Sequence, residues 1–251
     1  MSLQTLIIQR RFCGPPQSGN GGYVCGRVAK HLPGSATVRL KAPPPLETEL
    51  RINVSDGVAQ MLQGATVIAE GRTAEVNLTP PPPPSFAEAE DAAKSYIGFT
   101  RHSFPRCFVC GPQRGVGDGM RIFPGPIGSR SIVAAPWIPE ASLADDTGSV
   151  AVEFLWAALD CTSAFAVLPI PEDKAIVLGE LLARVDRTVR TGEKCVAVGW
   201  PLQIDGRKRF AGSAVFSESG MPVALARATW IEVPLNSFVP QPRSDQKGGD
   251  R

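Results

Sequence analysis

Two carboxylates interrupt an otherwise apolar stretch in the second half of the chain. The segment 145–166 opens with Asp, Thr and Gly residues and then runs apolar, with Glu153 and Asp160 inside it. Small polar residues before an apolar run are typical of a helix start, and the run predicts a helix over 148–166 that is buried all round. The two carboxylates are seven residues apart, close to two helical turns, so they share one face. Carboxylates are seldom buried unless they are paired or used, so both are candidate catalytic residues.

Each of these acidic residues also has a structural interpretation. Asp160 is equally suited to hydrogen bonds with the hydroxyl residues that follow it, and Glu153 to an ion pair with an arginine. Asp145 and Asp146 stand where a helix N-cap is expected, and capping is the common use of Asp there. We therefore expect these two residues to be N-caps rather than catalysts.

Composition and charge narrow the class of protein. The chain has 251 residues, 43% of them hydrophobic and 20% charged, as in ordinary globular proteins. A net charge of +2 without a dense basic block argues against nucleic acid as a partner. The first twelve residues lack the apolar run of a secretory signal, and no stretch is long enough for a membrane span. The six scattered cysteines are typical of free thiols, so we expect a cytoplasmic protein without a membrane partner.

The predicted elements repeat in the same order on either side of five consecutive prolines at 80–84. Turn signals separate strands expected at 3–12, 36–40, 47–54, 58–62, 65–70, 73–78, 120–123, 131–135, 175–185, 195–203, 207–216 and 223–233. The prolines indicate a stiff spacer. We expect an N-terminal domain (1–79), a proline-rich linker with a helix over 86–97 (80–106), a C-terminal domain (107–235) and a mobile tail (236–251).

Several segments resemble one family of proteins. SGNGGYVCGRVA (18–29) resembles the glycine-rich start of the central helix in hotdog-fold acyl-CoA thioesterases, and 36–54 resembles the strand pair that follows it. The second half, from GSVAVEFLWAALDC to ALARATWIEV, resembles the same unit with a full-length helix. Together they resemble the double-hotdog, thioesterase-like proteins over about residues 3–78 and 107–233. The resemblance implies an α+β tandem (double) hotdog fold, each half a long central helix wrapped by an antiparallel β-sheet.

That resemblance implies hydrolysis of an acyl-CoA-type thioester without a cofactor. Asn20, Gly21 and Gly22 would bind the thioester carbonyl at the amino end of the first central helix, where backbone N–H groups and the helix dipole stabilise an oxyanion. Asp160, with Glu153 as second choice, would activate water. Glycines allow close approach of a ligand, although the same residues also suit a glycine-rich cap.

The second half departs from the glycine pattern. Asp146, Thr147 and Gly148 stand where Asn20-Gly21-Gly22 stands in the first half, which makes them further candidates for substrate binding. The first central helix lacks a carboxylate, so we expect one working site rather than two. The alternative is a non-catalytic hotdog protein that binds an acyl group or another small ligand. We expect a homodimer in either case, because exposed apolar faces are usually buried in pairs.

Two further features have a structural and a functional interpretation. Cys107 and Cys110, followed by a glycine, form half of a zinc knuckle, but zinc needs four ligands and no second pair has ligand spacing. We therefore predict a turn with free thiols and no metal site. Arg207, Lys208 and Arg209 form the densest charge cluster; a solvated edge strand is favoured over a contact with the phosphates of CoA.

Overall fold

The computed structural model describes residues 4–238 of the chain. Within that range eleven strands form a single antiparallel sheet in the order β1-β3-β4-β5-β2-β8-β11-β10-β9-β7-β6. The strands are β1 (Gln4–Ile7), β2 (Ala36–Leu40), β3 (Glu49–Ser55), β4 (Val58–Gln63), β5 (Thr66–Thr73), β6 (Gly125–Pro126), β7 (Val133–Trp137), β8 (Lys174–Val185), β9 (Cys195–Asp205), β10 (Lys208–Ser217) and β11 (Pro222–Pro234). First-half strands thus lie at one end of the sheet and second-half strands at the other.

The junction between the two halves is the pairing of β2 with β8. These strands are antiparallel, with Ala36 opposite Ala183 and Arg39 opposite Glu180. Arg39 and Glu180 also form an ion pair at 2.8 Å on this seam. The pairing gives each strand a partner where a separate sheet would have an exposed edge.

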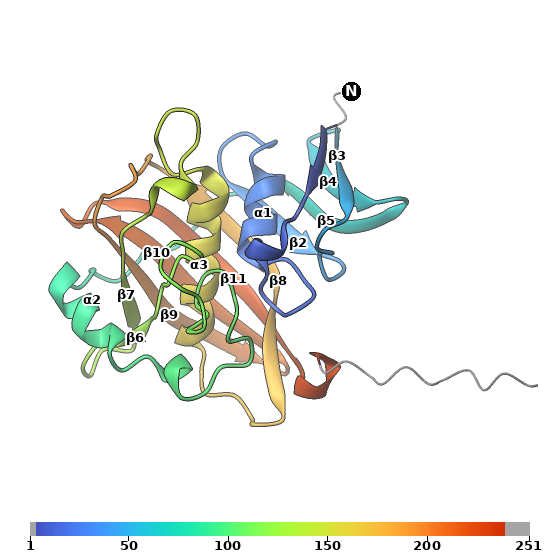
Figure 1. Ribbon diagram of the computed structural model, residues 1–251. Coiled ribbons are helices and arrows are strands. Elements are labelled where there is room, and N and C mark those ends of the chain that lie inside the picture. The colour runs from blue at the N-terminus through green and yellow to red at the C-terminus, as the bar shows by residue number, and fades with distance from the viewer. Residues whose placement is uncertain (1–3, 239–251) are drawn as a thin grey trace, which may run out of the picture.

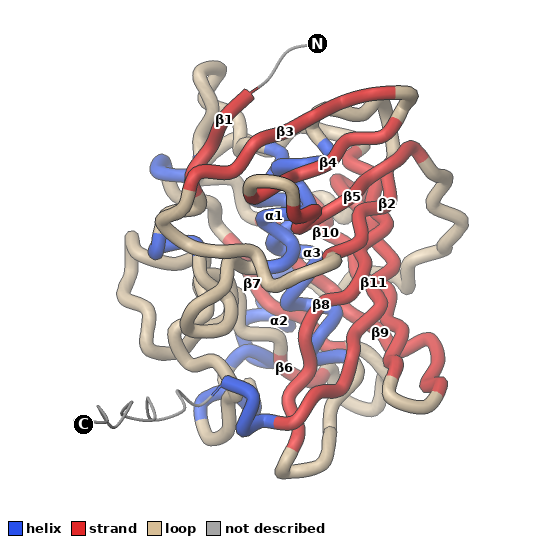
Figure 2. The backbone as a smooth tube through the Cα atoms, turned by 90° about the vertical axis from the view of Figure 1, so that its right-hand side faces the viewer, coloured by secondary structure: helices blue, strands red, loops and turns tan. Residues whose placement is uncertain are grey.

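Two helices, α1 (Gly21–Ala29) and α3 (Val152–Ala166), lie side by side on one face of the sheet (Figures 1 and 2). Nearly every residue of α3 is buried, as the apolar run predicts. Leu155 and Leu159 are among the largest fully buried side chains. Each such burial stabilises the fold by roughly 1.5–3 kcal/mol. The main core therefore lies between this face of the sheet and the two helices.

The connection between the halves covers part of the opposite face of the sheet. Helix α2 (Phe86–Ala93) starts with a capping box between Ser85 and Glu88 and packs on β7. Ala89 and Ala92 join a second apolar cluster with residues of β7, β9 and β10. Short 3-10 helices complete the described elements: η1 (Arg10–Phe12), η2 (Ile97–Phe99), η3 (Ala141–Leu143) and η4 (Leu235–Phe238).

Some expected boundaries are wrong for identifiable reasons. The turn expected at Gly71 does not form, because β5 runs through it to Thr73 and a side chain there would press on Val28 and Val38. Of the strand expected at 73–78, only Thr73 is in a strand, as the last residue of β5. The expected strand at 120–123 does not form: Arg121 has a positive φ of 54°, and the N–H groups of Met120 and Ile122 donate to the carbonyls of Phe108 and Val109.

The linker and tail also differ in part from the expected limits. The linker helix ends at Ala93 rather than 97. Residues 236–238 of the predicted tail belong to η4, and its remainder lies outside the described residues. The division into two domains stays a prediction. Among residues 4–238, no helix has the length and apolar character needed to cross a membrane.

Candidate active site

Asp160 lies where the middle of α3 meets the start of α1, and it is 1% exposed. Its Oδ2 accepts hydrogen bonds from the backbone N–H of Gly22 at 2.8 Å and from Asn20 Nδ2 at 3.0 Å. The hydroxyls of Thr162 and Ser163 donate to backbone carbonyls instead of to this carboxylate. Three residues predicted for the site therefore meet in space, although they come from opposite halves of the sequence.

Burial controls the charge of Asp160. Loss of hydration raises the pKa of its carboxyl to about 7, and the bonds from Gly22 and Asn20 offset only part of that rise. Its Oδ1 has no hydrogen-bond partner among residues 4–238. One carboxylate oxygen is thus anchored, while the other is buried without a hydrogen-bond partner in the described part of the chain.

Glycines let α1 and α3 approach this closely. A Cβ on Gly22 would lie 2.3 Å from the Cβ of Asp160 and 2.6 Å from the backbone oxygen of Trp156. A Cβ on Gly26, one turn later, would lie 2.5 Å from the Cα of Glu153. All three distances are far inside van der Waals contact. The two glycines therefore fix the crossing that places the start of α1 on Asp160.

The backbone N–H groups of the first turn of α1 are divided between several acceptors. Asn20 is the N-cap, and its Oδ1 accepts from the Tyr23 N–H at 2.9 Å. The Gly22 N–H donates to Asp160. The Gly21 N–H, at the first position, has no acceptor within the helix itself, and Gly21 lines the adjacent cavity. Gly21 is therefore the donor best placed for a ligand.

A cavity of about 1140 Å³ opens beside Asp160. Such a volume suits a sizeable ligand. Its wall next to the site includes Asn20, Gly21 and Asp160. Its apolar wall comes mostly from the end of α3, from β8 and from β11, with Phe165, Leu168, Ile170, Ile176, Leu178 and Trp230. Cationic side chains also line it: Lys41, Arg101, Lys174 and Arg207. The arrangement fits a ligand with an apolar part and an anionic part.

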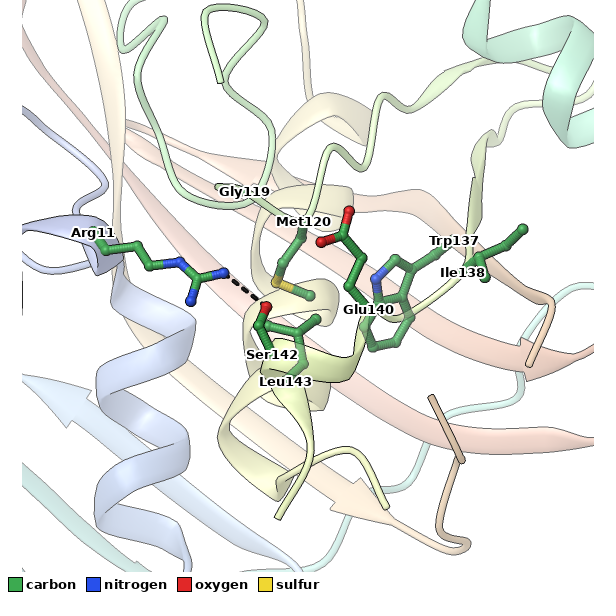
Figure 3. Close-up of a pocket in the computed structure, with 8 residues that line it drawn as sticks. All are labelled: Arg11, Gly119, Met120, Trp137, Ile138, Glu140, Ser142 and Leu143. Carbon is green, nitrogen blue, oxygen red and sulfur yellow. Dashed lines mark hydrogen bonds between the residues drawn. The ribbon is translucent and has the colours of Figure 1, made fainter. Parts of the chain in front are cut away.

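Figure 3 shows a second, much smaller pocket, of about 10 Å³, near the start of α3. Arg11 points across it and donates to Ser142 Oγ at 2.9 Å (Figure 3). A space of this size holds little more than one water molecule. None of its lining residues borders the large cavity, so it is not the candidate site.

Glu153 faces α1 like Asp160, as the seven-residue spacing predicts, but it has a different environment. Its Oε1 lies 3.7 Å from Nε of Arg27, and both side chains are largely buried. Glu153 does not border the large cavity. The structural interpretation, an ion pair with an arginine, describes this residue, while Asp160 alone of the two carboxylates reaches the cavity.

The residues of the second half that were expected to bind substrate do not lie at the large cavity. Asp146, Thr147 and Gly148 are in an exposed loop and do not border the large cavity. The expected capping is wrong: α3 begins at Val152, and its N-cap is Ala151, which makes no side-chain cap. Asp145 Oδ1 instead accepts from the Thr147 backbone N–H at 2.8 Å, closing a local turn.

Three cysteines gather beside Asp160. Cys107, Cys110 and Cys161 are buried, line the cavity, and have Sγ atoms within 4.8 Å of one another. Hydrogen bonds from the other two thiols, Cys110 first, hold the pKa of Cys107 well below its usual range. Sequence reasoning considered the first two cysteines but missed Cys161. Its position directly after Asp160 on α3 was the signal that could have found it.

Comparison with known proteins places this architecture. No protein-family model matches the chain, and no curated protein matches it. Solved structures do. The tesB protein of Mycobacterium avium subsp. paratuberculosis is 12% identical, covers 92% of this chain and 93% of its own, and has a TM-score of 0.60. An acyl-CoA thioesterase II from Mycobacterium marinum is 13% identical with the same coverage and a TM-score of 0.55.

A third structure carries the name of the fold. A protein of unknown function from Alicyclobacillus acidocaldarius, described as having a hot dog fold, is 11% identical, with 92% of this chain and 93% of that chain covered and a TM-score of 0.55. The expected resemblance to hotdog-fold thioesterases is thereby confirmed at the level of structure. The chain has the hotdog fold of these proteins.

Proposed function

We propose that this chain is a double-hotdog hydrolase of acyl-CoA-type thioesters. The observation that carries the proposal is that Asp160, a buried carboxylate on the wall of a large and mostly apolar cavity, has one oxygen without a hydrogen-bond partner among residues 4–238. The helices α1 and α3 would be the two central helices of the tandem, joined through the β2–β8 pairing. Thioesterases among the structural neighbours support the reaction class.

In the proposed reaction Asp160 is the general base. Its free Oδ1 accepts a proton from a water molecule while the water oxygen attacks the thioester carbonyl carbon. The carbonyl oxygen becomes an oxyanion near the Gly21 N–H and the positive end of α1. The carbon–sulfur bond then breaks, and the protonated Asp160 returns its proton to the leaving thiolate. The products are a carboxylic acid and a free thiol.

The rest of the cavity fits the two ends of such a substrate. The apolar wall formed by α3, β8 and β11 would hold the acyl group. The cationic side chains, Arg207 among them, would meet the phosphates of CoA. Hydrolysis needs no cofactor in this scheme. A cytoplasmic location and a homodimer stay predictions, and gel filtration with light scattering tests the second.

A non-catalytic ligand-binding protein is the second candidate. The observation that favours it is that the amide of Asn20 and the N–H of Gly22 already bond to Asp160, so neither is free for an oxyanion. Thiol release from a panel of acyl-CoA thioesters of short, long and aromatic chains separates the two candidates. Turnover supports the hydrolase, whereas binding without turnover supports the second candidate.

A further inference from the structure

The three buried cysteines beside the cavity have the spacing of a metal-thiolate site. Cys107 Sγ and Cys161 Sγ are 3.6 Å apart, and the Sγ atom of Cys110 lies within 4.8 Å of both. Tetrahedral zinc with Zn–S bonds of about 2.3 Å separates its sulfur ligands by roughly 3.8 Å. The three side chains therefore need little movement to bind one ion.

Two of these cysteines, Cys107 and Cys110, lie on one tight turn. The Gly111 N–H closes the turn on the Cys107 carbonyl at 2.9 Å. A Cβ on Gly111 would lie 2.5 Å from that carbonyl oxygen, so the turn requires glycine there.

The third thiol comes from the other side of the site. Cys161 follows Asp160 on α3 and faces the turn across the cavity wall. Asn20 Nδ2 lies 3.6 Å from Cys161 Sγ and 3.9 Å from Cys107 Sγ, which adds a further donor to the cluster. Three thiols therefore lie together in the structure. The prediction of no metal site considered only Cys107 and Cys110, because the spacing in the sequence does not indicate the third.

Two other nearby side chains, His102 and Cys13, are poor candidates for a fourth ligand. His102 Nδ1 accepts from the Phe104 N–H at 2.9 Å, which leaves the proton of a neutral ring on Nε2, so neither nitrogen is available to a metal. Cys13 Sγ accepts from Arg114 Nη2 at 3.1 Å. All three cysteines border the cavity, so a fourth ligand would come from that side.

We propose that Cys107, Cys110 and Cys161 bind one Zn²⁺ ion, with the fourth position open to the cavity. Thiolates are soft ligands that select zinc over calcium or magnesium. A site with three protein ligands and an open position differs from a closed structural zinc site with four. The inference is independent of the proposed hydrolysis, because it concerns metal content alone.

The test is metal analysis of the full chain purified without chelator and supplied with zinc under reducing conditions. We expect one zinc per chain by mass spectrometry of the metal. Replacement with Co²⁺ should give the intense visible bands of a tetrahedral site and a thiolate-to-cobalt band in the near ultraviolet. The cobalt spectrum of the unmodified protein reports the thiolate ligands without any variant.

Variants then assign the ligands. Cys161→Ser should weaken zinc binding by more than the ~10–100-fold that the loss of an outer-shell partner costs. Cys195→Ser is the matched control, since Cys195 is also buried but lies outside the cluster and the cavity. Cys110→Ser repeats the test should Cys161→Ser fail to fold. Circular dichroism checks the folding of each variant.

Three results would overturn the inference. One is a folded, fully reduced protein that takes up no zinc or cobalt. A second is zinc that remains in folded Cys161→Ser and Cys110→Ser alike. The third is a disulfide between Cys107 and either partner in protein purified with zinc present, which would make the cluster a redox pair.

Discussion

Gly22→Ala tests the helix crossing on which the site depends. The new Cβ would lie 2.3 Å from the Asp160 Cβ and 2.6 Å from the backbone oxygen of Trp156, and a backbone atom cannot move aside as a side chain can. Overpacking costs about 1–3 kcal/mol. Loss of the Gly22–Asp160 hydrogen bond, which involves a charged group, costs about 1.5–3 kcal/mol more. Alanine returns about 1 kcal/mol as the better helix former.

The expected net loss in the free energy of unfolding is about 1.5–5 kcal/mol, measured by urea denaturation. Gly115→Ala is the control, because a Cβ on Gly115 meets open space, and we expect a change within about 0.5 kcal/mol. A Gly22→Ala protein as stable as the unmodified chain would refute the close crossing. Equal losses in both variants would show a general effect of the substitution instead.

Three further substitutions separate structural from functional charges. Glu153→Gln should lower the free energy of unfolding by about 1–3 kcal/mol, because it leaves Arg27 without its ion-pair partner. This range lies between the values measured for exposed and for buried ion pairs. Loss of thioester turnover in the folded variant would contradict a purely structural role for Glu153. Arg207→Ala should raise KM for a CoA thioester about two- to fivefold, because a single exposed contact between the arginine and a phosphate contributes little to binding. The free energy of unfolding should not change. Arg209→Ala should lower stability by about 2–4 kcal/mol, because this half-buried arginine pairs with Glu232 and donates to two backbone carbonyls after α3. If Arg207→Ala lowered stability and Arg209→Ala raised only KM, the assignment of Arg207 to substrate binding and of Arg209 to the fold would be contradicted.

The arginine cluster also shows where sequence patterns mislead. The favoured interpretation, a solvated edge strand, is wrong about the edge, because β10 lies between β9 and β11 in the sheet, although Arg207 and Lys208 are exposed to solvent as it predicted. Charged residues at a strand end have the same sequence pattern at an edge and in the interior. What distinguishes Arg209 is its pairing with Glu232 on the neighbouring strand, and that requires the register of the sheet.

Local sequence was enough to predict the buried helix and the shared face of its carboxylates. The unbroken apolar run of α3 leaves few alternatives, and helical periodicity sets which residues share a face. The start of the helix was harder to predict. An Asp followed by Thr and Gly suits both a helix cap and a local turn, because the same side-chain oxygen accepts a backbone N–H in each.

The contacts of the site depend on tertiary packing. Gly22 and Asp160 are 138 residues apart, and their hydrogen bond exists only because glycines on α1 let it lie against α3. The glycines were interpreted as room for a ligand, whereas Gly22 makes room for the other helix. The same docking brings Cys161 to the Cys107 turn, a meeting that no spacing in the sequence indicates.

The central claim, that Asp160 activates water against a thioester, is tested most directly by thiol release from the acyl-CoA panel with unmodified protein and Asp160→Asn. The amide is nearly the same size and can still accept the Gly22 N–H, so the fold should persist. We predict turnover by the unmodified protein and a drop of at least about 100-fold in Asp160→Asn, the lower end of what a general base contributes. Full turnover by folded Asp160→Asn, or none by the folded unmodified protein across the panel, would contradict the account.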